Sequence, residues 1–295
     1  MQTHRKVHNA MDKVTIHTLR QMKTRGEPIS MLTAYDYPTA LLIDQAKLEM
    51  ALVGDTLGMV VHGFETTLPV TMDMMVLHCQ AVRRGLKRAL LVADLPFMSY
   101  QISPEQAKAN AARLLAEGGA DAVKLEGGQT VAATVRGLTE TGIAVMGHVG
   151  LTPQSVSAMG GFKVQGKTLE AAQHVLDDAR ALEAAGVFAI VLEGIPAPLA
   201  DIITRAVSVP TIGIGAGAGC DGQVLVMHDL LGLYDRFVPS FVKQYADLGA
   251  AMRGAFEAYR DDVRARTFPA AEHEFSLSDE VLQALRAHLD APETE

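Results

Sequence analysis

The sequence contains no tryptophan, only two cysteines and only 5% aromatic residues. Cys79 and Cys220 are too few for a disulfide framework, and they lack the spacing of metal ligands, so we expect both to be reduced thiols. With so few aromatic side chains the core has to be aliphatic. The hydrophobic fraction of 48% in 295 residues is sufficient for one large domain.

Long apolar runs and an excess of basic residues are also missing. No apolar segment approaches the roughly 18 residues that span a bilayer, and residues 1–25 lack the apolar stretch of a signal peptide. The formal net charge is −8, without a basic stripe, which argues against nucleic-acid binding. We therefore expect a cytoplasmic protein that acts on small molecules and binds neither nucleic acid nor membrane.

What the sequence does contain is a repeated pattern of short apolar runs that stop at a chemically capable residue. Five such runs end at Asp55, Asp94, Glu126, His148 and Glu193. Runs of β-forming residues of this length are typical of buried parallel strands. In a (β/α)₈ barrel the carboxyl ends of the strands form one rim, which holds the active site.

Strand-like and helix-like segments alternate from Ile29 to about Leu233. We count seven strands and place an eighth after the region 224–231. Strict alternation implies a parallel sheet, and eight such units predict an α/β fold of the (β/α)₈ TIM-barrel type. A doubly wound open sheet is the alternative, but it would gather functional groups at one switch point.

Local signals define two further segments. Ser103, Pro104 and Gln106 predict a helix start with a capping box. Residues 276–295 predict an acidic amphipathic helical extension that packs on the barrel or on a neighbouring subunit. We therefore divide the chain into a single barrel domain with an N-terminal arm or helix, residues 1–275, and this extension.

Asp55, Asp94 and Glu126 supply hard oxygen ligands, which suit Mg²⁺. We expect one or two of them to bind the ion directly and the rest to bind through water. The alternative is that these acids cap helices in the loops after the strands. Lys124 lies two residues before Glu126 on the same face. A lysine inside a barrel needs an anion, either Glu126 or a substrate carboxylate such as that of a 2-keto acid.

Glu193 is the candidate for the base that removes a carbon-bound proton, and a strand-end ion pair is the alternative. His148 either donates a hydrogen bond to a reacting oxygen or caps a turn. The glycine-rich segment 213–219 is better explained by close backbone packing than by a dinucleotide site. Residues 159–166 have the composition of a lid or of a simple connection.

Several longer strings are more specific than these patterns. They are Thr33-Ala-Tyr-Asp-Tyr37, Val53-Gly-Asp-Thr-Leu-Gly-Met59, Ala93-Asp-Leu-Pro-Phe-Met98, Val123-Lys-Leu-Glu-Gly-Gly128 and Gly147-His-Val-Gly-Leu-Thr-Pro-Gln154. Together with others they make residues 15–273 closely similar to the 3-methyl-2-oxobutanoate hydroxymethyltransferase (ketopantoate hydroxymethyltransferase) family.

The resemblance implies a barrel of the phosphoenolpyruvate/pyruvate superfamily with one Mg²⁺ per subunit. It implies transfer of a hydroxymethyl group from the co-substrate 5,10-methylenetetrahydrofolate to 3-methyl-2-oxobutanoate, through a magnesium-stabilised enolate. The products are 2-dehydropantoate and tetrahydrofolate, in the first step of pantothenate biosynthesis. Members of this family are commonly cytoplasmic homo-oligomers, from octamers to decamers.

Carried over position by position, the resemblance implies metal ligation by Asp55, Asp94 and Glu126. It implies keto-acid binding by Asp55, Thr56, Asp94 and Lys124, and proton abstraction by Glu193. Thr56 departs from the usual serine of the family, but it keeps the hydroxyl group. The sequence identifies no residues for the folate.

Two other functions stay open at this point. One is a Mg²⁺-dependent carbon–carbon lyase or mutase of the same superfamily that acts on a 2-keto acid, although the chain lacks a reactive cysteine motif. The other is a non-catalytic keto-acid-binding protein. The five strand-end groups argue against it, because unused buried charges reduce stability.

Overall fold

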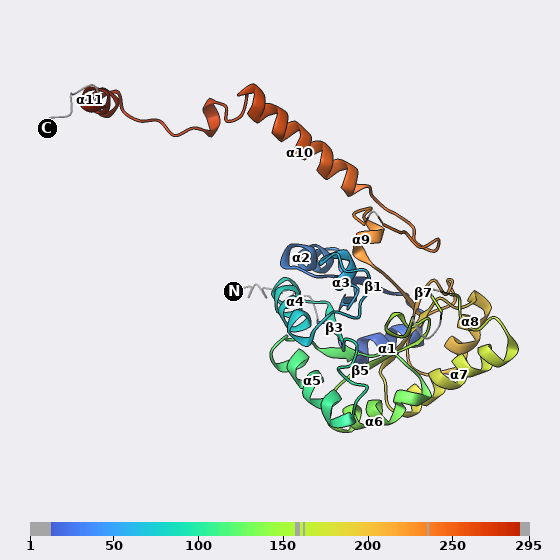
Figure 1. Ribbon diagram of the computed structural model, residues 1–295. Helices are drawn as coiled ribbons and strands as arrows, with labels where there is room; N and C mark the ends of the chain where they lie inside the picture. Colours follow the sequence, from blue (N-terminus) through green and yellow to red (C-terminus); the bar gives the residue numbers. More distant parts are fainter. Residues whose placement is uncertain (1–12, 157–159, 162, 235, 290–295) are drawn as a thin grey trace, which may run out of the picture. The chain divides into compact units, whose positions relative to one another are not determined.

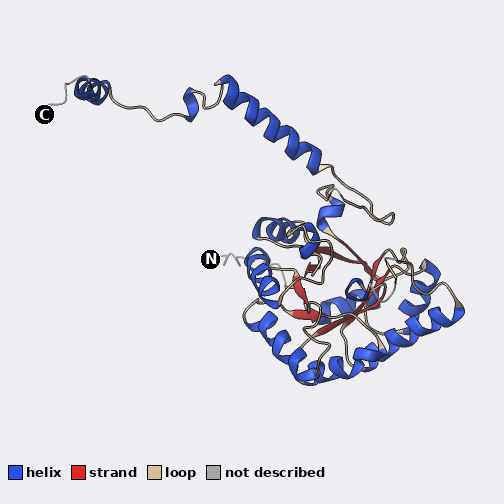
Figure 2. Cartoon of the chain, in the orientation of Figure 1, coloured by secondary structure: helices blue, strands red, loops and turns tan. Residues whose placement is uncertain are grey.

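The computed structural model describes residues 13–156, 160–161, 163–234 and 236–289. Eight parallel strands close into a barrel in sequence order, with β8 paired to β1 (Figures 1 and 2). This topology confirms the predicted (β/α)₈ barrel and rules out the open doubly wound sheet. The strands are β1 Ile29–Thr33, β2 Met50–Val53, β3 Leu90–Asp94, β4 Ala122–Lys124, β5 Val145–Gly150, β6 Ala189–Glu193, β7 Thr211–Ile214 and β8 Gly222–Leu225.

Within residues 13–246, helices lie between successive strands and surround the barrel (Figure 2). In the first half of the chain they are α1 Ile16–Arg25, α2 Tyr37–Gln45, α3 Leu57–Val60, α4 Met72–Gly85, α5 Pro104–Ala116 and α6 Ala132–Glu140, with a 3₁₀ turn η1 Gln129–Val131. In the second half they are η2 Pro153–Ser155, α7 Leu169–Ala184, α8 Ala197–Ala206, α9 Met227–Leu230, α10 Leu248–Ala265, η3 Ala271–His273 and α11 Asp279–Leu289.

The eighth strand lies earlier than predicted. It spans Gly222–Leu225 and so overlaps the start of the region 224–231 that was expected to precede it, while Met227–Leu230 of that region form the short helix α9. The physical reason is close backbone packing: a Cβ on Gly222 would lie 2.4 Å from the Ile29 carbonyl oxygen of β1. The strand that closes the barrel therefore begins with a glycine, which weakens its β-forming signal.

The start of α5 is only partly as predicted. The Ser103 hydroxyl accepts a hydrogen bond from the Gln106 backbone N–H at 3.2 Å, which confirms the N-cap. The expected capping box is wrong, because Gln106 Oε1 accepts no hydrogen bond from the described residues, while Nε2 donates to the Met98 carbonyl at 3.1 Å. The loop after β3 thus supplies a competing acceptor at this position.

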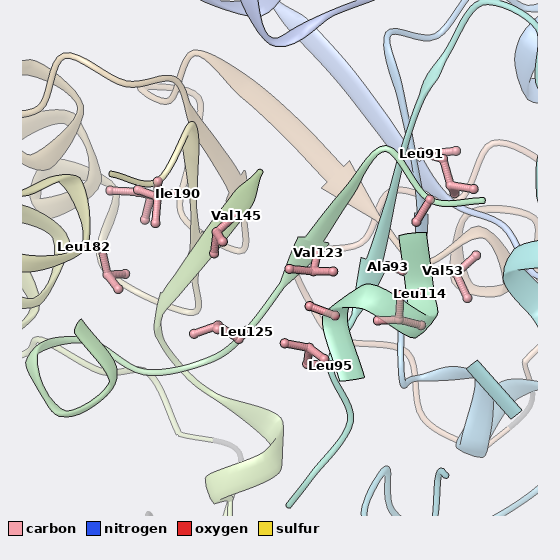
Figure 3. Packing of buried hydrophobic residues seen from close by; sticks show 14 of the residues in the cluster. Val53, Leu91, Ala93, Leu95, Leu114, Val123, Leu125, Val145, Leu182 and Ile190 are labelled. Atoms are coloured by element: carbon pink, nitrogen blue, oxygen red, sulfur yellow. The ribbon is translucent and has the colours of Figure 1, made fainter. Parts of the chain in front are cut away.

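Strand residues alternate between two cores. Leu91 and Ala93 of β3 face outward into the core shared with the helices, where Leu114 of α5 also lies (Figure 3). Leu90 and Val92 belong to a second cluster inside the barrel. Because side chains alternate along a strand, Asp94 is the next residue to face inward. The same alternation places Lys124 and Glu193 at the inner carboxyl ends of β4 and β6.

The amino end of the barrel is closed by α1. Leu19 and Met22 of this helix are buried in the inner cluster. Lys23 donates from Nζ to Asp221 Oδ2 at 2.8 Å and to the backbone carbonyls of Thr204 and Val209 at 3.0 and 2.9 Å. Each of the three N–H groups of this ammonium thus has an acceptor.

Among the described residues, 247–289 form a compact unit separate from the one that ends at residue 246. Its main helix, α10, was not predicted, and the domain boundary at residue 275 stays a prediction. The predicted C-terminal helix is present as α11. No helix in the described part of the chain has the length and apolar character to cross a membrane.

Candidate active site

The side chains predicted at the strand ends come together at one cavity inside the carboxyl rim of the barrel. Its polar lining consists of Thr33, Asp55, Thr56, Asp94, Lys124, Glu126, His148 and Glu193. Apolar side chains, among them Leu52, Val191, Ile214 and Val224, line the rest of the cavity. The structure thus brings every predicted site residue to one place, although they come from five strands.

Asp94 and Lys124 form the central ion pair. They are register partners in adjacent strands β3 and β4, and Asp94 Oδ1 lies 2.9 Å from Lys124 Nζ. The other carboxyl oxygen of Asp94 accepts the Asp55 backbone N–H at 3.1 Å. All three residues are buried. Lys124 is therefore neutralised by Asp94 rather than by Glu126, its neighbour along the same face.

The cavity holds more negative than positive charge. Burial, followed by the negative charge of Asp94, raises the pKa of Asp55 to about 7. Burial also raises the pKa of Glu126 well above its ordinary value, against the opposing effect of Lys124. Burial would lower the pKa of Lys124, but Asp94, Glu126 and Asp55 outweigh it, so this pKa is raised. Lys124 is thus a fixed cation beside crowded carboxylates.

His148 lies between Lys124 and Glu193. Its Nδ1 is 3.3 Å from Lys124 Nζ, and its Nε2 is 3.1 Å from Glu193 Oε2. An ammonium group can only donate, so Nδ1 is the acceptor and the proton of the neutral ring is on Nε2, facing Glu193. Burial, then Lys124, lowers the pKa of His148, which favours this neutral form. The side chain contacts residues of the cavity and does not cap a turn.

Thr56 lies in the turn after β2. Its hydroxyl accepts a hydrogen bond from the Tyr35 hydroxyl at 3.2 Å, and the residue lines the cavity. Burial raises the pKa of the Tyr35 hydroxyl, so this group stays a donor. The hydroxyl group that Thr56 shares with the serine usual in the family is therefore held at the edge of the cavity.

Gln154 belongs to the site, but no sequence pattern identified it. Its Nε2 donates to Asp55 Oδ2 at 2.9 Å, and its backbone N–H donates to Glu126 Oε2 at 3.0 Å. The residue is 5% exposed. It is uncharged and follows β5 by several residues, so it lies outside the strand-end pattern. The one available signal was its place at the end of the motif Gly147-His-Val-Gly-Leu-Thr-Pro-Gln154.

The glycine-rich segment after β7 is explained by close packing, as expected. A Cβ on Gly217 would lie 2.3 Å from the Ala197 side chain, and one on Gly215 would lie 2.7 Å from the Phe241 ring. Gly215 also has φ +61°, a conformation that favours glycine. Of the loop at 159–166, residues 159 and 162 lie outside the described part of the chain, so the lid stays a prediction.

The comparisons with known proteins decide the family. The family model for ketopantoate hydroxymethyltransferase matches residues 13–271. The chain belongs to the ketopantoate hydroxymethyltransferase family. The 3-methyl-2-oxobutanoate hydroxymethyltransferase of Moorella thermoacetica is 60% identical over 263 residues, covering 89% of this chain and 98% of that protein. The enzyme of the same name from Carboxydothermus hydrogenoformans is 56% identical over 275 residues, covering 93% and 100%.

Among solved structures, phosphoenolpyruvate phosphomutase from Streptomyces platensis has a TM-score of 0.58 at 14% identity, covering 93% of this chain and 97% of that one. At this identity the likeness supports the barrel fold alone.

The family assignment confirms the predicted family and the prediction that the chain is an enzyme that transfers a one-carbon group. Mg²⁺, the folate and the roles of individual residues stay predictions.

Proposed function

We propose that the chain transfers a hydroxymethyl group from 5,10-methylenetetrahydrofolate to 3-methyl-2-oxobutanoate. The products are 2-dehydropantoate and tetrahydrofolate. This reaction would be the first step of pantothenate biosynthesis, and it would take place in the cytoplasm. One observation carries the proposal beyond the family name: a buried cluster of carboxylates and one lysine lies beside an apolar wall in a single cavity. A small keto acid with a carboxylate and a branched apolar chain matches both halves of this cavity.

The donor set fits a magnesium ion. When ionised, Asp55, Asp94 and Glu126 would carry three negative charges against the one positive charge of Lys124, and Mg²⁺ prefers such oxygen ligands. Within the described residues, no three acidic, histidine or cysteine side chains form a preassembled metal cluster. We expect Mg²⁺ to be held by one or two carboxylates, with water and substrate oxygens completing the shell. When bound, Mg²⁺ would act as a Lewis acid toward the keto oxygen.

Lys124 and Thr56 are positioned to bind the keto acid. Lys124 is charged at any pH at which the protein functions, so it attracts the substrate carboxylate. The Thr56 hydroxyl, which accepts from Tyr35, is free to donate its own proton to a substrate oxygen. Val191, Ile214 and Val224 would contact the isopropyl group. Polar groups would thus orient the acid end and apolar groups the other end.

Glu193 would take the proton from C3 of the keto acid. Its carboxylate ends β6, lines the cavity and has a side chain that is 16% exposed. His148 Nε2, at 3.1 Å, would hold one oxygen and leave the other for the proton. The electron pair left at C3 would then form the new bond to the one-carbon unit of the folate, whose bonds to the two folate nitrogens break. One water molecule would supply the hydroxyl group of the product, and its remaining proton and the proton taken from C3 would return to the two nitrogens of tetrahydrofolate. A sheltered cavity favours this step because it limits hydrolysis of the reactive donor.

Product formation tests the proposal. The purified full chain is incubated with 3-methyl-2-oxobutanoate, methylenetetrahydrofolate and Mg²⁺, and the mixture is followed by NMR. We expect 2-dehydropantoate in stoichiometric amounts with tetrahydrofolate, and none in excess EDTA. Cleavage of the keto acid without 2-dehydropantoate would favour the lyase alternative. Binding without turnover would favour the non-catalytic alternative.

We also propose that the chain forms a homo-oligomer, an octamer to decamer, through α10. This helix of 18 residues has no buried residue, and five apolar side chains are exposed at helical spacing. They are Leu248, Met252, Phe256, Tyr259 and Val263. An isolated helix needs packing of its apolar face to be stable, and a second copy would supply it. Phe256→Glu should lower the mass measured by light scattering, and an unchanged mass would contradict this.

A further inference from the structure

We propose that Gln154 is a positioning residue that sets the affinity of the rim for Mg²⁺, because it holds one oxygen of Asp55 and one of Glu126. The inference rests on the proposed metal site and extends it to a residue outside the set of ligands. A neutral side chain with this role would belong to the machinery of the reaction although it touches neither substrate nor metal.

Gln154 contacts both carboxylates from one position. Its side-chain N–H donates to Asp55 Oδ2 at 2.9 Å, and its backbone N–H donates to Glu126 Oε2 at 3.0 Å. Asp55 follows β2 and Glu126 follows β4, so one residue of the loop after β5 joins two strand ends that are not neighbours. The distance between the two carboxylates therefore depends on where Gln154 lies.

The orientation of the amide is fixed by its remaining bonds. The second Nε2 hydrogen donates to the Leu95 carbonyl at 3.0 Å. The amide oxygen accepts from the Tyr100 hydroxyl at 2.9 Å and from Gln101 Nε2 at 3.2 Å. Both donor and both acceptor positions of the amide are thus used. A flipped amide would place its oxygen against the Asp55 carboxylate, so only one orientation satisfies the neighbours.

The arrangement leaves the other oxygens of the two carboxylates for the cavity. Asp55 Oδ1 and Glu126 Oε1 are not engaged by Gln154, and Glu126 Oε1 lies 3.7 Å from His148 Nδ1. Partners that orient metal-ligating carboxylates typically change metal affinity by about 10- to 100-fold when they are removed. Gln154 has the geometry of such a partner for two carboxylates at once.

Calorimetric titration of Mg²⁺ into EDTA-stripped protein tests the inference. Gln154→Leu keeps similar volume and the backbone N–H but removes the amide, so we expect the Kd for Mg²⁺ to rise about 10- to 100-fold. Tyr100→Phe leaves the amide but removes one of the two donors to its oxygen, together with the hydroxyl that bonds the backbone of Glu126, so we expect a smaller rise. Gln101→Ala is the matched control, because it removes a bond to the same oxygen while Tyr100 still holds it, and its Kd should stay within about threefold of wild type.

A second readout separates positioning from structural support. In Gln154→Leu the Mg²⁺ concentration that gives half-maximal exchange of the C3 proton should rise by a larger factor than the maximal exchange rate falls, since the ligands themselves remain. A lower melting temperature with an unchanged Kd would overturn the inference and leave Gln154 a structural residue. If Gln154→Leu does not fold, an unchanged Kd in Tyr100→Phe overturns it equally. Wild-type protein that does not bind Mg²⁺ would overturn the proposed function as well.

Discussion

The charged side chains at the two ends of the barrel differ in how they are paired. At the amino end, Lys23 has Asp221 and two backbone carbonyls as acceptors for its three N–H groups, and Asp221 also accepts the Thr211 backbone N–H at 2.8 Å. At the carboxyl end, three buried carboxylates surround Lys124, with Glu193 nearby. The first set is balanced within the chain, whereas the second contains more acidic groups than the one lysine can pair.

The comparison shows that burial alone does not identify a functional charge. A buried charge that is fully paired by its own chain is explained by the fold, because an unpaired one would cost several kcal/mol. A buried excess of one sign is not explained by the fold. It favours a ligand of opposite sign, which we propose here to be a divalent cation.

The largest expected effect is loss of proton transfer in Glu193→Gln. The amide keeps the shape of the side chain but cannot accept the C3 proton, so exchange should fall about 10²- to 10⁴-fold. Binding of Mg²⁺ and keto acid should persist, because Glu193 is not among the proposed ligands. Deuterium incorporation at C3, followed by NMR in D₂O, measures the rate. Exchange at the wild-type rate would remove Glu193 from the role of base.

Lys23→Met should lower the stability of the protein without lowering its proton-exchange rate. It leaves the partly buried Asp221 without its cation, and we expect the free energy of unfolding in urea titrations to fall by about 1–3 kcal/mol. The exchange rate per folded molecule should not change, because Lys23 lies at the amino end of the barrel. A large loss of exchange in folded protein would contradict the division between balanced and unbalanced charges.

Lys124→Met removes the lone cation from the unbalanced set. The charge-assisted bond to the substrate carboxylate is lost, which corresponds to about 10- to 100-fold weaker keto-acid binding. Calorimetric titration of keto acid in the presence of Mg²⁺ measures this affinity. Equal affinity in the variant and wild type would show that Lys124 is only the structural partner of Asp94.

The smallest expected effect concerns Asp229, a buried acid in α9 outside the lining of the cavity. Burial raises the pKa of its carboxyl from 3.8 to about 6. A raised pKa in the folded state stabilises the protein below about pH 4, and this contribution is lost as the pH rises through about 6. Asp229→Asn should therefore be more stable than wild type by about 1–2 kcal/mol at pH 8, and by less at pH 5. An equal difference at both pH values in urea unfolding would contradict the shift.

Most of the fold and the charged part of the site could be predicted from the sequence. Asp94, Lys124 and Glu193 were identifiable because side chains alternate along strands and the apolar runs stop at fixed depth. Strand β8 was misplaced because a glycine opens it. Gln154 was missed because a neutral loop residue shows its role only through contacts in three dimensions. Helix α10 was overlooked although its apolar residues have helical spacing.

We propose that the carboxylates at the carboxyl end form a joint site for a divalent cation and a keto acid. Coupled calorimetric titrations measure whether the two ligands bind together. Mg²⁺ is titrated into EDTA-stripped wild-type protein with and without 3-methyl-2-oxobutanoate, and the keto acid is titrated with and without Mg²⁺. We expect each ligand to raise the affinity of the protein for the other ligand by the same factor, about 10-fold or more. Independent binding of the two ligands, or no binding of Mg²⁺, would contradict it.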